Sequence, residues 1–396
     1  MQRLFLFLVS FAMAGCVAVP DARPPQDTGA IPQPPPLPAG SAVAAGVSSG
    51  PPVETLAITG SDAASALVAF RASCAKILFR DDISGLTSRT DWQAPCGAAE
   101  SWSGDPRAFF LSQFETARIG DGAAFATGYF EPEIAGSRTP RPGYDVPVYR
   151  MPPELVRGWP ADMPESERTG RPPLGRYDAS GNFVPYYERA EIEAGALANR
   201  GLEIAWAADD IEFFFLQIQG SGLLRLPDGS LMRIGYARQN GREYVGIGSV
   251  MRERGLIGEG PGQYPGSMQG IMQYLRDYPE EGRELMRLNK SWIFFRELTT
   301  DGPLGSLEIP VRRGDSVAVD PNFVPYGAPV FLDLDRDVAD GLWVAQDTGG
   351  AIKGANRFDT FWGSGLDARE IAGGMSGRGS ALVLLPKGTI ARLQVR

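Results

Sequence analysis

The chain has 396 residues, 43% of them hydrophobic, and its 38 Lys and Arg against 47 Asp and Glu give a formal net charge of −9. This length predicts two or three domains with sizeable cores, and an acidic chain without a basic stripe is a poor nucleic-acid binder. The sequence contains no histidine. Mechanisms that need an imidazole base, a Ser-His pair or a histidine metal ligand are therefore excluded, and acid–base work falls to Asp, Glu, Lys or Tyr.

The N-terminus is typical of an export signal. A short basic segment, residues 1–3, precedes an apolar run over residues 4–13 that is too short to span a bilayer. We therefore expect residues 1–15 to be a signal peptide and Cys16 to be lipidated, which would anchor the chain to a membrane in the periplasm. An ordinary secretory signal with an incidental cysteine is the alternative. Val17, in place of an aspartate, favours the outer membrane.

Residues 16–52 are rich in Pro, Gly, Ala and Ser, cannot bury much apolar surface, and are predicted to form an extended tether. Beyond it, Cys74 and Cys96 are expected to form a disulfide worth roughly 3 kcal/mol, because the compartment is oxidising. Two buried free thiols are the alternative. Two thiols without histidine make a poor zinc site, and no metal is expected.

The folded part begins with helix and strand patterns in alternation. A capped apolar pattern predicts a helix over residues 61–79, an Asp-Pro start predicts a second helix over 105–118, and residues 123–131 are typical of a strand. The middle of the chain predicts loops with short strands over residues 136–185, a helix over 188–199 and a buried strand over 211–219. A hairpin is then predicted over residues 223–238, two helices over 249–254 and 267–288, and a strand over 292–296. Short strands between Gly, Pro and Asp turns then indicate a small β-barrel, over residues 316–319, 328–334, 341–346 and 380–385.

Residues 343–363 carry two carboxylates in contrasting settings. An apolar strand pattern delivers Asp347 into a glycine turn, and Asp359 follows among aromatic residues. Burial against aromatic groups raises a carboxyl pKa. Asp359 is therefore the better candidate for an acid that stays protonated near neutral pH.

Six segments of the chain resemble the membrane-bound lytic murein transglycosylase A family. They occur in the family's order and extend over the chain from residue 53 onward. One such motif would be weak, but six in sequence identify a family resemblance. The segments are residues 128–132, 149–153, 189–197, 217–222, 267–269 and 347–359.

The resemblance implies a mainly β fold with some α. A double-psi β-barrel domain would be built from residues 53–132 and 302–396, and a second β-rich domain, residues 133–301, would be inserted between its two parts. A glycan groove would run between the domains, as suits an extended polymer.

The resemblance also implies a lyase that cleaves the β-1,4 bond between N-acetylmuramic acid and N-acetylglucosamine and leaves 1,6-anhydromuramic acid. Asp359 would be its acid/base. One carboxyl is sufficient, because the C6 hydroxyl of the sugar attacks C1 from the face that the leaving group departs. No cofactor is implied, and the expected partners are peptidoglycan strands, the membrane through the lipid anchor, and other cell-wall enzymes.

Further residues are candidates for binding or supporting the glycan. Asp347 could support developing positive charge, or simply accept backbone hydrogen bonds from the Gly349-Gly350 turn. Lys353 could bind a peptide carboxylate or pair with an acid. The remaining candidates are polar side chains for N-acetyl groups and aromatic rings for stacking on sugars, with turn capping and core packing as alternatives: Gln217, Gln219, Ser221, Tyr129 and Trp362.

Other functions stay open at this point. Asp-Thr-Gly at residues 347–349 is an aspartic-protease signature, but those enzymes need two such aspartates facing each other, and Gly350 stands where they carry Ser or Ala. A glycoside hydrolase would use Asp347 and Asp359 as its carboxylate pair. A noncatalytic lipoprotein would bind murein without releasing soluble products. Calcium at the acidic run 333–337 is a further alternative, weakened by the lack of the EF-hand glycine and terminal Glu.

Overall fold

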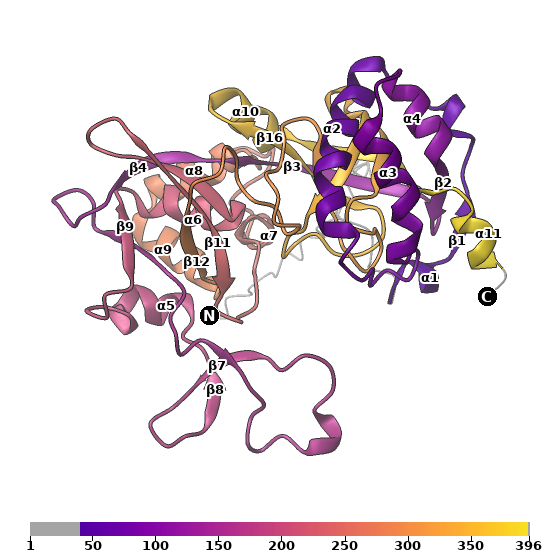
Figure 1. The fold of residues 1–396 in the computed structure, drawn as a ribbon. Helices are drawn as coiled ribbons and strands as arrows, with labels where there is room; N and C mark the ends of the chain where they lie inside the picture. The colour runs from indigo at the N-terminus through magenta and orange to yellow at the C-terminus, as the bar shows by residue number, and fades with distance from the viewer. Residues whose placement is uncertain (1–39, 395–396) are drawn as a thin grey trace, which may run out of the picture. The chain divides into compact units, whose positions relative to one another are not determined.

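The computed structural model describes residues 40–394, drawn in colour in Figure 1. The predicted signal peptide, residues 1–15, and the predicted lipidation site Cys16 lie outside these residues. About 32% of the described residues are helical and 29% are in strands, so the fold is mixed, with more helix than the mainly β protein with some α that we expected. No helix within residues 40–394 is both long and apolar enough to cross a bilayer.

The first sheet consists of eight strands: β1 (Val47–Ser49), β2 (Phe114–Ile119), β3 (Ala123–Glu131), β13 (Ser316–Ala318), β14 (Pro329–Leu334), β15 (Gly341–Asp347), β16 (Arg357–Ser364) and β17 (Ser376–Pro386). Six of them close into a ring in the order β17-β14-β15-β13-β16-β3, because β3 pairs with both β16 and β17. The pairs β13–β15 and β16–β3 are parallel. The small barrel expected near the C-terminal end is therefore present, with one strand supplied from much earlier in the chain.

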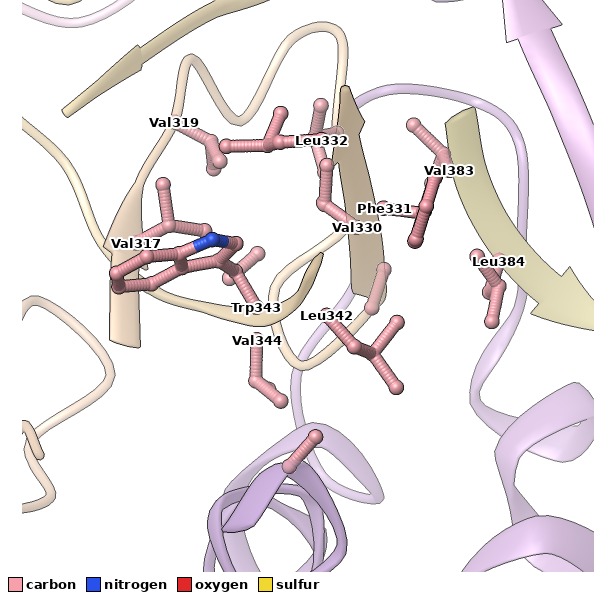
Figure 2. Close-up of a cluster of buried hydrophobic side chains, with 14 of the residues drawn as sticks. Val317, Val319, Val330, Phe331, Leu332, Leu342, Trp343, Val344, Val383 and Leu384 are labelled. Carbon is pink, nitrogen blue, oxygen red and sulfur yellow. The ribbon is translucent and has the colours of Figure 1, made fainter. Parts of the chain in front are cut away.

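The core of this ring is formed by the apolar side chains that alternate along its strands. Val317 and Val344 are fully buried, and Figure 2 shows them beside Trp343. Successive side chains of a strand point to opposite faces. Phe358 on β16 belongs to this core, so its neighbour Asp359 points to the other face of the sheet.

Helices pack beside this sheet, and α2 contacts β15. Figure 1 shows α2, α3 and α4 gathered together. The cap of α2, expected at Ser61-Asp62, begins two residues earlier at Thr59. Thr59 and Asp62 form a capping box and exchange hydrogen bonds of 3.1 Å. A disulfide joins Cys74 on α2 to Cys96 on α3. The helices of this part are α1 (Ala42–Ala45), α2 (Gly60–Ile77), α3 (Gln93–Ser101), α4 (Pro106–Gln113), α10 (Leu366–Gly374) and α11 (Thr389–Gln394), with 3-10 turns at Val53–Thr55, Arg89–Trp92 and Asp337–Ala339.

The remaining strands form a six-stranded sheet, β12-β11-β10-β4-β9-β5, and a three-stranded sheet, β6-β7-β8. The predicted hairpin is confirmed as the antiparallel pair β10–β11. These strands are β4 (Glu133–Ser137), β5 (Val146–Tyr149), β6 (Val156–Arg157), β7 (Leu174–Tyr177), β8 (Phe183–Pro185), β9 (Glu203–Ala207), β10 (Ser221–Arg225), β11 (Leu231–Gln239) and β12 (Ile293–Leu298). The accompanying helices are α5 (Arg189–Glu191), α6 (Asp210–Gln219), α7 (Ile247–Glu253), α8 (Met268–Asp277) and α9 (Pro279–Leu288), with a 3-10 turn at Glu165–Glu167 and a π-helical turn at Ile192–Ala196.

Residues 211–219 were expected to be a buried strand, and this prediction is wrong because they form helix α6. The Asp209 side chain accepts a hydrogen bond from Glu212 N at 2.8 Å and caps the helix start. Gly220, with φ of 80°, ends the helix in the left-handed conformation. A continuous apolar run does not distinguish a buried helix from a buried strand, because burial on every side removes the periodic signal.

Three other boundaries differ from expectation. The helix predicted over residues 105–118 ends at Gln113, and β2 begins at once. The helix predicted over residues 267–288 breaks before Pro279, because a proline disfavours helical backbone in the residue that precedes it. Residues 47–49, expected to belong to the tether, pair with β2 as strand β1.

Candidate active site

Two carboxylates lie on either side of β13, on the same face of the ring. In the register of the sheet, Ala318 on β13 pairs with Asp347 on β15 and with Asp359 on β16. Thr127 on β3 pairs in turn with Asp359. Paired residues of neighbouring strands project from the same face, and two strand spacings separate the aspartate Cα atoms by roughly 10 Å. The ring therefore holds Asp347 and Asp359 as a pair.

A β-bulge in β15 decides which residue joins this row. The register between β13 and β15 shifts so that Gln346 is skipped. The buried Gln346 side chain donates to Ser73 Oγ on α2 at 2.9 Å and accepts from Ser316 Oγ at 2.5 Å. These bonds hold Gln346 in the core, and the extra residue re-aims the strand so that Asp347 comes to the open face.

Asp359 is partly buried and receives one hydrogen bond from the described residues 40–394. Thr127 Oγ1 donates to Asp359 Oδ1 at 2.6 Å. Arg357 Nη2 donates to the same Thr127 oxygen at 2.9 Å, which leaves the Thr127 hydroxyl proton for the carboxylate. Burial raises the pKa of Asp359 to about 6, against the opposing effects of Arg357 and Thr127. A carboxyl with this pKa can act as an acid near neutral pH.

Asp347 is more completely bonded. Its Oδ1 accepts from Ser306 N at 2.8 Å, Ser306 Oγ at 2.9 Å and Thr348 N at 2.8 Å, and its Oδ2 accepts from the Tyr129 hydroxyl at 3.0 Å. Burial raises the pKa of Asp347 above its ordinary value, although these four hydrogen bonds oppose the rise. Asp347 is thus the member of the pair whose carboxyl group is fixed in place by hydrogen bonds.

The surface around the pair is apolar. Tyr129 and Phe361, two residues farther along β3 and β16, have ring centroids 4.9 Å apart. Val311, Ala318 and Ile352 complete this cluster. Because these groups exclude water from one side of both carboxylates, they account for the desolvation that raises the two pKa values.

Tyr244 approaches the pair from the segment between β11 and α7. A Cβ built on Gly350 would lie 4.0 Å from Tyr244 Cβ. Burial, and then the charge of Asp359, raise the pKa of Tyr244, so its phenol stays protonated. The sequence contains no signal for this residue, since an isolated tyrosine in a polar loop marks no motif. Only the tertiary structure brings it to the site.

Comparison with known proteins identifies the family of this chain. Residues 125–296 match the family model described as the MltA specific insert domain, and residues 315–385 match the 3D domain. The chain is 31% identical over 286 residues to membrane-bound lytic murein transglycosylase A of Vibrio cholerae, covering 68% of this chain and 69% of that protein. The chain belongs to the membrane-bound lytic murein transglycosylase A family.

Other members of this family agree in sequence and in fold. The Escherichia coli K12 protein is 31% identical over 269 residues, which cover 65% of this chain and 64% of that protein. The crystal structure of a membrane-bound lytic murein transglycosylase from Agrobacterium tumefaciens matches with a TM-score of 0.76 at 31% identity, covering 88% of this chain and 99% of that one. Escherichia coli MltA with bound chitohexaose matches with a TM-score of 0.60 at 26% identity, covering 86% and 94%.

Two aromatic residues that we expected to stack on sugars serve other purposes in this member of the transglycosylase A family. Trp362 lies in the core, with its ring 5.6 Å from that of Trp343 and its Nε1 donating to Thr360 Oγ1 at 3.0 Å. Tyr129 packs on Phe361 and donates its hydroxyl to Asp347. Both rings are buried, so for each of them the structure favours core packing, the alternative considered above, over stacking on sugars.

The three polar candidates lie on α6 and at the start of β10, and not at the end of a single strand. Gln219 Oε1 accepts from Phe130 N at 3.0 Å, which ties α6 to β3. The buried Gln217 amide has no hydrogen-bond partner among the described residues. Ser221 is the buried first residue of β10. Gln217 is therefore buried with both polar atoms of its side chain unpaired.

The loop between the two aspartates carries the remaining candidates. A Cβ on Gly349 would lie 2.8 Å from Ile352 Cγ1, so this turn needs a glycine. Gly350 and Lys353 are exposed, and Lys353 forms no ion pair within residues 40–394. The same described part of the chain contains no group of His, Cys, Asp or Glu that could hold a metal ion, which includes the acidic run 333–337.

Proposed function

We propose that this chain is a lytic transglycosylase that cleaves the β-1,4 bond between N-acetylmuramic acid and N-acetylglucosamine in peptidoglycan, with Asp359 as its single acid/base. The contrast between the two carboxylates carries this proposal. Asp359 receives one hydrogen bond and has a pKa raised to about 6, whereas Asp347 receives four. Membership of a family of lytic murein transglycosylases supports it.

In the first step of this mechanism, Asp359 gives its proton to the glycosidic oxygen while the bond from C1 to that oxygen breaks. This leaves an oxocarbenium-like C1 and an ionised Asp359. The carboxylate then takes the proton of the C6 hydroxyl as O6 bonds to C1. Asp359 ends protonated, 1,6-anhydromuramic acid is formed, and no water is consumed. Since Thr127 holds Oδ1, Oδ2 is the oxygen that faces the sugar.

In this mechanism Asp347 is a fixed negative charge on the same face of the ring as Asp359. Three donors on Oδ1 and one on Oδ2 fix its orientation, so it is less able than Asp359 to turn toward C1 or toward a water molecule. A preorganised anion stabilises positive charge that develops at C1 without moving during the reaction. This argument favours a single-carboxyl mechanism over a hydrolase that uses Asp347 and Asp359 together.

The proposal includes a glycan site. The amide of Gln217, buried and without a partner among the described residues, has the donor and acceptor that an N-acetyl group requires. Lys353 is a cation on the loop between the two aspartates. The chitohexaose bound to Escherichia coli MltA is a precedent for a sugar chain in this fold.

We also propose the family's layout for the whole chain. The six-stranded ring would be a double-psi β-barrel formed by residues 53–132 and 302–396, with residues 133–301 inserted. The ring and the second sheet have separate hydrophobic clusters, which supports this division. Residues 1–15 would be removed as a signal peptide, and a lipid on Cys16 would place the enzyme on the periplasmic side of the outer membrane.

Digestion of purified sacculi in water labelled with oxygen-18, followed by mass spectrometry of the released muropeptides, tests the reaction. The proposal predicts anhydro ends without label. Reducing ends that contain one labelled oxygen would show hydrolysis, and the single-carboxyl mechanism would be wrong. Binding to sacculi without soluble products would show a noncatalytic protein.

A further inference from the structure

Three arginines gather around one tyrosine beside the end of β11. Arg157 lies on β6, Arg171 precedes β7, and Arg238 lies on β11. Burial, and then the charges of Arg171 and Arg238, lower the pKa of Arg157, while Tyr236 opposes this. The same three guanidinium groups act on the phenol of Tyr236. The four side chains are therefore close enough to share one electrostatic environment.

The fold brings these residues together from two sheets. A Cβ on Gly241, just after β11, would lie 2.6 Å from Leu174 Cβ on β7, so the small sheet packs closely on this strand end. A bulge between Tyr236 and Arg238 interrupts the pairing of β11 with β12. Bulges re-aim the side chains next to them. Tyr236 is 47% exposed, so the cluster is open to solvent.

The three arginines lack the carboxylate partners that other arginines of this region have. On the larger sheet, ion pairs join Arg138 to Glu297 at 2.5 Å, Arg225 to Glu133 at 2.5 Å and Arg233 to Glu131 at 2.8 Å. Within residues 40–394, none of the three clustered arginines forms an ion pair.

Some of their donors are buried and unused. Arg157 Nη1 donates to Pro172 O at 2.5 Å, but the buried Nε atoms of Arg157 and Arg238 have no hydrogen-bond partner among the described residues. A buried donor without a partner costs free energy, and like charges held together cost more. A bound anion would relieve both costs. Guanidinium groups match carboxylates in shape and charge, and bind them with two parallel hydrogen bonds.

The cluster lies within reach of the proposed active site. Arg238 is six residues from Tyr244, so their Cα atoms are at most about 20 Å apart. Tyr244 in turn lies beside Gly350 and feels the charge of Asp359. An extended peptide of four residues spans about 14 Å. A peptide attached to a muramic acid near Asp359 therefore covers most of this distance.

We propose that Arg157, Arg171 and Arg238 bind the carboxylates of the peptide stem that muramic acid carries, an inference that rests on the proposed function. In a strand that carries stems, the lactyl carboxyl of muramic acid is bound in the amide to the stem, so the free carboxylates are those of the stem. An amidase removes these and leaves a single lactyl carboxylate at the sugar itself. The cluster thus makes this enzyme prefer strands that carry peptides. It is a specificity site, separate from the acid/base at Asp359.

The test compares kcat/KM on glycan strands that carry stem peptides with kcat/KM on strands stripped of them by an amidase. The variant is Arg171→Gln combined with Arg238→Gln, and the matched control is Arg225→Gln, which removes an arginine of the neighbouring hairpin that has its own carboxylate. We expect the peptide-bearing to naked ratio to fall about tenfold or more in the variant, and to stay unchanged in the control. Lysine at both positions should restore much of the ratio.

Three outcomes would overturn the site. An unchanged ratio would show that the arginines do not recognise the stem, and an equal fall on both substrates would show a general or structural effect. Loss of binding to phosphatidylglycerol vesicles with an unchanged ratio would show that the cluster faces a membrane. Absence of turnover on both substrates in the parent enzyme would instead contradict the proposed function, so the two failures are distinct.

A direct binding measurement supports or contradicts the same assignment without turnover. The probe is a soluble muramoyl tetrapeptide, titrated calorimetrically into Asp359→Asn protein with and without the arginine substitutions. We expect affinity to fall about tenfold or more when the two arginines are replaced, and to weaken with added salt. The same peptide with its carboxylates amidated should bind both proteins equally weakly. Equal binding of the two peptides to the parent would contradict the proposal.

Discussion

Thr127 and Asp359 share a hydrogen bond of 2.6 Å across 232 residues of sequence. The bond joins β3, which precedes the second sheet in the chain, to β16, which follows it. Arg357 donates to the same threonine oxygen, so the proton of the Thr127 hydroxyl is directed at the Asp359 carboxylate. The acid of the proposed reaction is therefore oriented by a strand that sequence alone does not place beside it.

Replacing Asp359 by Asn should abolish turnover while the fold and glycan binding persist. The amide has the size of the carboxyl but cannot give and regain a proton, so the loss should exceed about a thousandfold. Release of soluble muropeptides from sacculi measures it, with thermal unfolding and sacculus binding as controls for fold and affinity. An Asp359→Asn protein that still turns over substrate would remove this residue from the mechanism.

The Thr127 hydroxyl should set the pH dependence of the enzyme. Asp359 must be protonated to act, so activity should decline as pH rises above the pKa of about 6. The Thr127 bond favours the charged form, and Thr127→Val should therefore raise this pKa and move the basic limb of the kcat/KM profile to higher pH. Thr127→Ser keeps the hydroxyl and should leave the limb in place. A limb that moves to lower pH in the valine variant would contradict the assignment.

Ionisation of the buried Asp359 carboxyl should also destabilise the folded protein above pH 6. Its pKa is about 6 in the folded chain against 3.8 for an ordinary Asp, so between these values the folded state binds more protons than the unfolded state. The free energy of unfolding should then fall as pH rises through this window, by up to about 3 kcal/mol. Asp359→Asn should remove this slope and be the more stable protein above pH 6. Urea unfolding on both sides of the window measures the difference, and parallel profiles would refute the burial argument.

Asp347 should matter for rate without being indispensable. Asp347→Asn keeps the shape but loses the charge, and its NH2 group cannot accept from the donors that face it. We expect kcat to fall by about tenfold to a hundredfold, together with a loss of about 1–3 kcal/mol in stability. Tyr129→Phe removes only one of the four donors and should cost less in both measures. Complete inactivity of a folded Asp347→Asn protein would place this aspartate in the catalytic set.

Local sequence patterns predicted a large part of what the structure contains. The helix that begins near Ser61, the strand over residues 123–131 and the hairpin around Asp228-Gly229 each depend on residues close together in the chain. The raised pKa of Asp359 was also expected from the sequence, because Phe358 precedes it and Phe361 and Trp362 follow within three residues. Such features need no information about distant contacts.

Contacts between residues far apart in sequence decided most of the failures, whereas the break before Pro279 has a local cause. Burial on every side made α6 look like a strand, and core packing removed Trp362 from the glycan face. Composition alone therefore excluded histidine and left acid–base chemistry to Asp, Glu, Lys or Tyr, and local pattern favoured Asp359 as the candidate acid. Strand register and the bulge at Gln346 decided what surrounds it, since pairings between residues far apart in sequence exist only in the folded chain.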